Sequence, residues 1–167
     1  MSGPERWFTK DAAFDGELAV RFGGALKQAR LGAFDHWSET PEGALGLVIL
    51  LDQVSRNTNR GSPLAFAGDA KALALAKTSV ARDYHHKLVP PLAMWLLMPF
   101  EHAEDIDAQN RCLSLFGTLG LHDMVYYAKM HLDIIARFGR FPHRNKVLGR
   151  KSTAAEIAFL QAGGFAG

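Results

Sequence analysis

Apolar residues recur along this chain at intervals of three and four positions, the spacing of one face of an α-helix. Phe14, Leu18 and Phe22 stand four apart and predict a first helix. The segment 45–54 is apolar on all sides except at Asp52 and Gln53, which is typical of a helix in the centre of a protein. No segment alternates cleanly between apolar and polar residues for more than four positions, so we expect no strand.

Residues that begin and end helices interrupt this pattern at regular intervals. Thr40, Pro41 and Glu42 supply an N-cap, a proline at the first helical position and a carboxylate in the first turn. Gly139 is suited to end a helix, and Thr153-Ala-Ala-Glu156 is a capping-box sequence. These signals predict further helices at about 70–82 with a cap at Asp69, 90–98 ended by Pro99, 103–117, 122–138 and 157–161.

The predicted fold class is all-α, with roughly seven to eight helices joined by short loops. The later helices are expected to pair as antiparallel hairpins. A chain of 167 residues favours one domain, 1–167, that is long enough to bury a core. Hydrophobic content of 48% and charged content of 22% are ordinary for a globular protein.

The net charge of +2 conceals a local excess of cations. Without the six lysines and arginines of residues 137–151, the chain has 13 basic and 17 acidic residues, a balance of −4. Nucleic-acid binding needs an extended basic face, so we expect no nucleic-acid partner. The single cysteine, Cys112, fits a reducing compartment, and residues 1–6 lack the apolar core of a signal peptide. The apolar runs 45–51 and 92–98 are too short to span a membrane, so we predict a cytoplasmic protein without membrane contact.

A basic loop spans residues 137–150. It contains four arginines, one lysine and one histidine, interleaved with Phe138 and Phe141, and no acidic residue lies between Asp133 and Glu156. Guanidinium groups are planar donors suited to carboxylate and phosphate. The basic loop therefore indicates either an anion site or an arginine network that holds the last helix to the body.

Polar side chains also occur on faces that are otherwise apolar. Helical spacing places His102 in line with Ile106 and Phe116, His131 in line with Ile135, and Asp52 on the side of Val48. A buried polar group without a partner costs about 1–3 kcal/mol. We therefore predict that Asp52, His102 and His131 meet the basic loop in one polar centre.

Structural interpretations of the same residues remain open. Asp52 and Arg56 stand four apart, the spacing of a simple ion pair along one helix. His131 fits equally a core histidine whose ring nitrogens have hydrogen-bond partners within the protein. The acidic residues near position 104 favour a helix N-terminus, and they are also suited to dock against the basic loop. They are Glu101, Glu104, Asp105 and Asp107.

Most catalytic and cofactor signatures are missing. Glu101-His102 and His131-x-Asp133 offer metal ligands, but their spacing matches neither His-Glu-x-x-His nor the Glu-x-x-His of di-iron bundles. Cys112 lies mid-helix, where we expect it to be buried and inert. The chain contains no nucleophile elbow and no glycine-rich nucleotide loop. We therefore predict no metal and no cofactor, and leave open whether the protein is an enzyme.

Several sequence blocks resemble a widespread bacterial family of helical proteins of unknown function with a tetratricopeptide-like fold. The most specific block is Phe-Gly-Arg-Phe-Pro-His-Arg-Asn at 138–145. The others are Leu50–Asn57 with Arg60-Gly61, Ala65-Phe66 with Asp69, Pro99–His102 with Glu104-Asp105 and Gln109, His131, Leu148–Arg150, and Ser152-Thr153 with Glu156. The chain departs from the pattern at Val54-Ser55, where the family more often has Phe-Pro. The resemblance implies an antiparallel helical stack and carries no established activity.

These arguments predict a pocket between helices that binds a small anionic ligand, a phosphate or a carboxylate. Arginines would clamp the anion, and histidines would orient it or transfer a proton. The predicted site residues are Asp52, Arg56, Asn57, His102, His131, Arg140, His143, Arg144, Asn145 and Arg150.

The alternative is a helical adaptor for a protein or peptide partner. Stacked helical hairpins form concave grooves. This interpretation expects an exposed groove lined by residues such as Met94, Trp95 and Met98, with the basic loop as a structural brace. The sequence does not indicate an oligomeric state.

Overall fold

The computed structural model describes residues 11–165, so residues 1–6, which bear on the signal-peptide prediction, lie outside it. No strand occurs within this range, and the all-α prediction is confirmed. In chain order the elements are α1 (Ala12–Arg30), η2 (Asp35–Glu39), α2 (Pro41–Ile49), η3 (Leu50–Val54), α3 (Ser55–Thr58), η4 (Pro63–Phe66), α4 (Asp69–Ala81), α5 (Tyr84–Lys87), α6 (Pro90–Glu101), α7 (Ile106–Thr118), α8 (His122–Phe138), η5 (Pro142–Arg144) and α9 (Ala154–Gln161).

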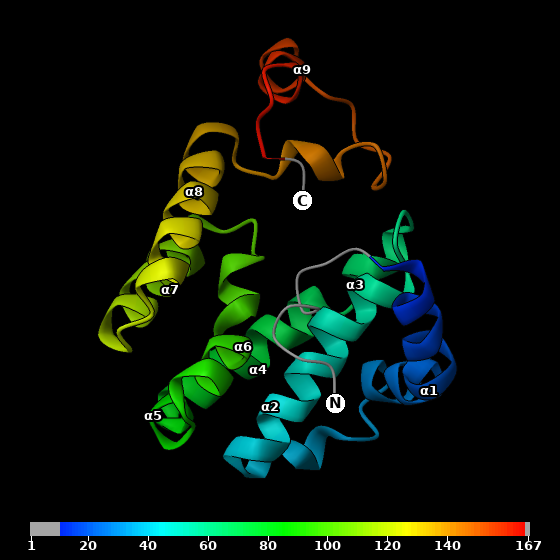
Figure 1. The fold of residues 1–167 in the computed structure, drawn as a ribbon, viewed down its shortest axis with the longest axis vertical. Helices are drawn as coiled ribbons and strands as arrows, with labels where there is room; N and C mark the ends of the chain where they lie inside the picture. Colours follow the sequence, from blue (N-terminus) through cyan, green and yellow to red (C-terminus); the bar gives the residue numbers. More distant parts are fainter. Residues whose placement is uncertain (1–10, 166–167) are drawn as a thin grey trace.

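The helices pack mainly against their neighbours in the chain. The elements α2, η3 and α3 form one continuous helical column, with α1 on one side and α4 and α6 on the other (Figure 1). α6 packs on α7, and α7 forms a hairpin with α8. No helix in residues 11–165 has the length and apolar character needed to cross a membrane.

Several predicted helix ends are confirmed. The hydroxyl of Thr40 accepts a hydrogen bond from the Gly43 N–H at 3.1 Å. Thr153 and Glu156 form the reciprocal capping box at the start of α9. Gly139 ends α8 with a φ of 68°, a left-handed conformation that glycine adopts without a steric penalty.

The prediction that Pro99 ends its helix is wrong, because α6 continues through Pro99 to Glu101. The φ angle of proline is compatible with a helix, but inside a helix its ring removes one backbone donor and crowds the carbonyl four residues earlier, so the burial of Phe100 and Glu101 must offset this cost. His102 is consequently the C-cap of α6 and not part of the following helix. α7 begins only at Ile106, with Asp105 as its N-cap.

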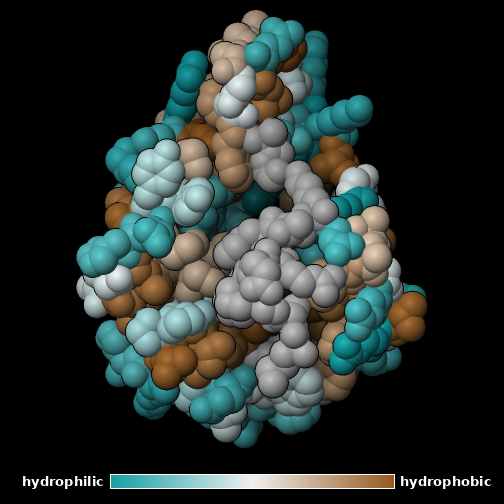
Figure 2. All heavy atoms as spheres, in the orientation of Figure 1, coloured by the Kyte–Doolittle hydropathy of each residue, from teal (hydrophilic) through white to brown (hydrophobic). Residues whose placement is uncertain are grey.

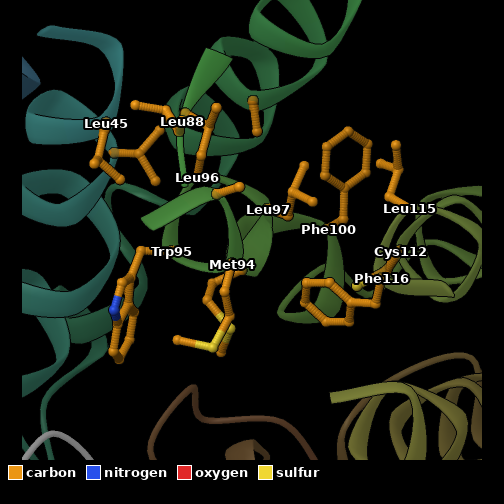
Figure 3. Close-up of a cluster of buried hydrophobic side chains, with 14 of the residues drawn as sticks. Leu45, Leu88, Met94, Trp95, Leu96, Leu97, Phe100, Cys112, Leu115 and Phe116 are labelled. Atoms are coloured by element: carbon orange, nitrogen blue, oxygen red, sulfur yellow. The ribbon is translucent and has the colours of Figure 1, made fainter. Parts of the chain in front are cut away.

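The core is centred on α6, in which all residues from Ala93 to Glu101 are buried. Figure 3 shows side chains of this helix meeting Leu45 and Leu88 on one side and Leu115 and Phe116 on the other. Cys112 is fully buried in the same cluster, and burial raises the pKa of its thiol. This agrees with the prediction of a buried, unreactive cysteine.

The expected groove along α6 is not formed. Met94, Trp95 and Met98 are each at most 7% exposed and pack into the core. A helix that is apolar on every side is stable only when other elements cover it, so these residues line no open surface. Hydrophobic and hydrophilic side chains are intermixed on the face drawn in Figure 2.

Candidate functional site

Asp52 lies in η3, a π-helical turn of the central column, and is only 1% exposed. Such turns often occur at functional sites. Its carboxylate accepts hydrogen bonds from Gln53 Nε2 at 2.6 Å, Arg56 Nη2 at 3.1 Å and His102 Nδ1 at 2.7 Å. Burial alone would raise the pKa of Asp52, but His102 and Arg56 outweigh it and hold the pKa well below its usual range. Asp52 is therefore ionised at neutral pH.

His102 reaches Asp52 from the C-terminal end of α6. A carboxylate can only accept, so Nδ1 carries the proton and Nε2 keeps a free lone pair. Nε2 makes no hydrogen bond to any residue of the range 11–165. Burial lowers the pKa of His102, so the ring is neutral at pH 7. Asp52 and His102 thus have the arrangement in which a carboxylate orients a general base.

Asp69 joins this group from the first position of α4, where both carboxylate oxygens lie 3.1 Å from Arg56 Nη2. The predicted N-cap role of Asp69 is wrong, because Gly68 occupies the cap position and the carboxylate binds Arg56. Gly68 also permits the close approach of α4 to η3, since a Cβ there would lie 2.3 Å from the Leu51 carbonyl oxygen. The missing side chain of Gly68 therefore helps place Asp69 beside Arg56.

Arg144 comes from η5 in the basic loop and is 7% exposed. Its guanidinium carbon lies 4.4 Å from the ring centroid of Phe141 and 4.9 Å from that of Phe66. Nη1 donates to the His102 carbonyl oxygen at 3.0 Å and lies 3.7 Å from Asp69, whereas the buried Nε has no hydrogen-bond partner. Burial lowers the pKa of Arg144 to about 10, with repulsion from Arg56 as the next cause. Arg144 remains charged but is incompletely bonded.

A hollow of about 250 Å³ opens beside Arg144 and His102. Its polar lining also includes three carboxylates, each with a partner of its own. Asp69 binds Arg56, Glu104 binds Arg150, and Asp105 caps α7. The remaining lining is mainly apolar, from Phe66, Ala70, Leu73, Pro99, Ala103 and Leu148.

Glu101 and His131 form a second buried pair next to Asp52. Their Oε1 and Nδ1 atoms lie 3.1 Å apart, and Nδ1 is also 2.9 Å from the Tyr127 carbonyl oxygen. A carbonyl oxygen can only accept, so we assign the proton of His131 to Nδ1, which donates to Tyr127. Burial, followed by repulsion from Asp52, raises the pKa of Glu101 to about 8. Burial lowers the pKa of His131, so both groups are neutral at pH 7 and the contact is not an ion pair.

Arg150 and Asn145 hold the basic loop to the link between α6 and α7. Arg150 donates from Nη1 and Nη2 to the Glu104 carboxylate at 2.6 and 2.9 Å, and from Nε to Asn145 Oδ1 at 2.9 Å. The backbone N–H of Phe141 also donates to Glu104, at 2.8 Å. Two parallel bonds between a guanidinium and a carboxylate fix orientation as well as distance, so Arg150 acts as a brace in this structure.

Arg140 and Asn57 lie away from the hollow. Arg140 binds Glu156 of α9 at 2.6 and 2.9 Å, and Asn57 donates to Asp15 of α1 at 2.8 Å. Hydrogen bonds from Arg140 and from the Thr153 N–H lower the pKa of Glu156 to about 2. The first contact joins the basic loop to α9, and the second joins α3 to α1.

His143 is the remaining predicted site residue. Its ring lies 5.7 Å from that of Phe141, and its buried Nδ1 has no hydrogen-bond partner. Burial lowers its pKa to about 4, so the ring is neutral. The structure thus gathers Asp52, Arg56, His102, His131 and Arg144 into the predicted polar centre, with His143 beside it and the other four predicted residues in bracing contacts.

Sequence reasoning missed Phe66, Asp69 and Glu101 as members of the site, whereas the docking of Glu104 on the basic loop was one of the interpretations left open and is seen in its bonds to Arg150. Phe66 and Asp69 stood in a motif block of the resemblance, and this was the available signal. Glu101 was expected at a helix N-terminus or against the basic loop, and nothing in its local sequence indicated that α6 would continue to it and bury it.

Residues 1–164 match the family model described as "Bacterial protein of unknown function (DUF924)". The chain belongs to this family. It is also similar to the solved structure of ATU0120, a protein of unknown function from Agrobacterium tumefaciens. The two are 41% identical, the match covers 96% of this chain and 90% of that chain, and the TM-score is 0.90. No curated protein matches the chain.

The predicted membership of a bacterial family of unknown function is confirmed. Neither DUF924 nor ATU0120 carries an activity in its description. Function must therefore be argued from the hollow and the polar groups around it.

Proposed function

We propose that this DUF924 protein binds a small molecule with a carboxylate or phosphate group in the hollow beside α4. Arg144 would contact the acidic group, and His102 would accept a proton. The observation that carries the proposal is the state of Arg144, a buried cation with an unpartnered Nε at a hollow that His102 also lines. Buried guanidinium groups are normally fully hydrogen-bonded, so the spare Nε donor favours a bound anion. The Nε atoms of Arg30 and Arg56 also lack a partner, but neither arginine lines the hollow.

The charges in the polar centre favour the uptake of one proton when the anion binds. At pH 7 the carboxylates of Asp52 and Asp69 balance the cations of Arg56 and Arg144, while His102 is neutral. An incoming anion would leave one uncompensated negative charge in a partly buried site, which is unfavourable. Protonation of His102 at Nε2 restores the balance, so we expect binding to tighten as the pH falls.

The lining of the hollow restricts the ligand further. The carboxylates of Asp69, Glu104 and Asp105 border it and can accept further hydrogen bonds. They favour a ligand that has hydroxyl groups in addition to its acidic group. A volume of about 250 Å³ is small for a ligand site, which suits a molecule of a few heavy atoms.

A second function, an adaptor for a protein partner, is favoured by one observation. Arg56, Arg140 and Arg150 all bind carboxylates, as a structural brace would require. In this case Arg144 would complete the brace, and a surface other than α6 would bind the partner. The tetratricopeptide-like stacking, the single domain and the cytoplasmic location expected from the sequence remain part of our proposal.

Isothermal titration with inorganic phosphate, glycolate and glycerol phosphate tests the ligand proposal. We expect at least one of them to bind, and glycolate, which stays ionised between pH 6 and 8, to bind more tightly at pH 6. Arg144→Met keeps an apolar chain near Phe66 and Phe141 but removes the charge. It should weaken binding about 10- to 100-fold, as expected for lost hydrogen bonds to a charged group of about 1.5–3 kcal/mol.

The matched control is Arg111→Met, which removes an exposed arginine of α7 that does not line this hollow. It should bind as the wild type does. Equal binding by Arg144→Met and the wild type, or no binding of any of the three compounds, would contradict the ligand proposal. A large loss of melting temperature in Arg144→Met without any ligand effect would favour the brace.

A further inference from the structure

A second cluster of potential ligand side chains lies in the turn between α4 and α6. Asp83 precedes the short helix α5, and His85 and His86 lie within it. One potential ligand atom from each of the three side chains lies within 4.8 Å of the other two. No other group of three histidine, cysteine or acidic side chains in residues 11–165 meets this condition.

The backbone of this turn brings Asp83 and His86 together. Asp83 has φ 61° and ψ 27°, and it is the one non-glycine residue with a positive φ in the described part of the chain. Its carboxylate Oδ1 lies 2.5 Å from His86 Nδ1, and the rings of His85 and His86 lie 4.1 Å apart. Two imidazoles and one carboxylate therefore converge without help from a distant element.

His85 provides an independent indication of a ligand. The residue is only 5% exposed, and its Nδ1 is buried without a hydrogen-bond partner. Buried imidazole nitrogens usually have a partner, either a protein group or a bound species.

We propose that Asp83, His85 and His86 bind one divalent transition-metal ion, Zn²⁺ or an ion of similar preference. Two imidazoles and one carboxylate suit such ions better than Mg²⁺ or Ca²⁺, which prefer oxygen ligands. Three protein ligands leave at least one position for water or another molecule. The cations Lys87 and Arg111 act on Asp83 and His85 respectively, and their repulsion opposes the binding of a metal cation.

The cluster is separate from the polar centre around Asp52. It lies at the start of α6, whereas His102 follows the end of that helix, and twelve helical residues span about 18 Å. Figure 1 shows α5 at the end of the molecule opposite α9 and the basic loop. The metal proposal therefore does not depend on the ligand proposed for the hollow.

Titration of the full chain with Zn²⁺ by calorimetry, and with Co²⁺ by visible absorption, tests this proposal. We expect one ion per chain and d–d absorption bands from Co²⁺ bound by nitrogen and oxygen. His86→Gln and Asp83→Asn should each weaken Zn²⁺ binding at least tenfold. Both side chains are more than half exposed, and asparagine tolerates the left-handed backbone of position 83, so the fold should persist.

The control variant is His122→Gln, which removes an exposed histidine at the start of α8. It should bind Zn²⁺ as the wild type does. Circular dichroism of each variant confirms that the helices are retained. The proposal is overturned if Zn²⁺ does not bind at millimolar concentration, or if it binds His86→Gln as tightly as the wild type.

Discussion

Replacing Asp52 with asparagine should lower the free energy of unfolding by about 3–5 kcal/mol, because it removes one partner from a buried group of charges. Asp52 is 1% exposed and accepts from both Arg56 and His102. Asparagine keeps the volume but loses the charge, so Arg56 would depend on Asp69 alone. Urea unfolding at pH 7 measures the loss.

The pH dependence of this effect has a defined sign. The folded-state pKa of Asp52 lies below its usual range, so its contribution is present above about pH 4 and is lost as the pH falls further. The difference between Asp52→Asn and the wild type should therefore narrow below pH 4. Asp133→Asn removes an exposed carboxylate of α8 and should change stability by less than about 0.5 kcal/mol. A loss below about 1 kcal/mol for Asp52→Asn would show that the polar centre does not depend on Asp52.

Replacing Glu101 with glutamine should stabilise the protein increasingly as the pH rises. Burial raises the pKa of Glu101 from 4.5 to about 8, so between these values the folded state holds a proton that the unfolded state has released. The contribution of Glu101 is therefore complete below about pH 4.5 and is lost as the pH rises toward 8. Glutamine resembles the protonated acid and does not titrate.

Urea unfolding at pH 6.5, 7.25 and 8 measures this second effect. The advantage of Glu101→Gln should grow by up to about 1.4 kcal/mol per pH unit, the equivalent of one proton, and by about half as much near pH 8, where the folded state also loses the proton. Because burial lowers the pKa of His131, this residue affects the pH dependence of stability only below about pH 6.5, which lies outside the chosen range. Glu17→Gln, at an exposed position of α1, should show no such trend. A constant difference between Glu101→Gln and the wild type over this range would mean that Glu101 is ionised in the folded state.

The fold class and most helix ends could be predicted because they depend on local chemistry. The cap at Thr40, the capping box at Thr153 and the glycine after α8 each involve residues that are close in sequence. The end of α6 could not be predicted in this way. Packing of Phe100 and Glu101 into the body outweighs the helix-breaking tendency of Pro99, and this packing involves residues far apart in the chain.

Part of the membership of the candidate site was predictable, but its pairing was not. The positions of Asp52, His102 and His131 on apolar faces indicated a polar centre, since buried polar groups need partners. Which arginine lacks a close carboxylate partner depends on tertiary contacts, since Arg144 lies 3.7 Å from Asp69 whereas the other three have carboxylate contacts of 2.6 to 3.1 Å. Arg56, Arg140 and Arg150 differ from Arg144 only through the positions of Asp69, Glu156 and Glu104 in space.

The side-chain ¹H–¹⁵N spectrum of histidine, recorded while glycolate or inorganic phosphate is added, shows whether His102 takes up a proton when an anion binds. We expect the Nε2 signal of His102 to move from that of a neutral, unprotonated nitrogen toward that of a protonated one. The exposed His122 should not change. His102→Gln identifies the signal, and Arg144→Met should abolish the movement. A ligand site formed by His102 and Arg144 would be contradicted if the His102 signal stayed constant at saturating ligand, or at millimolar concentrations of both compounds.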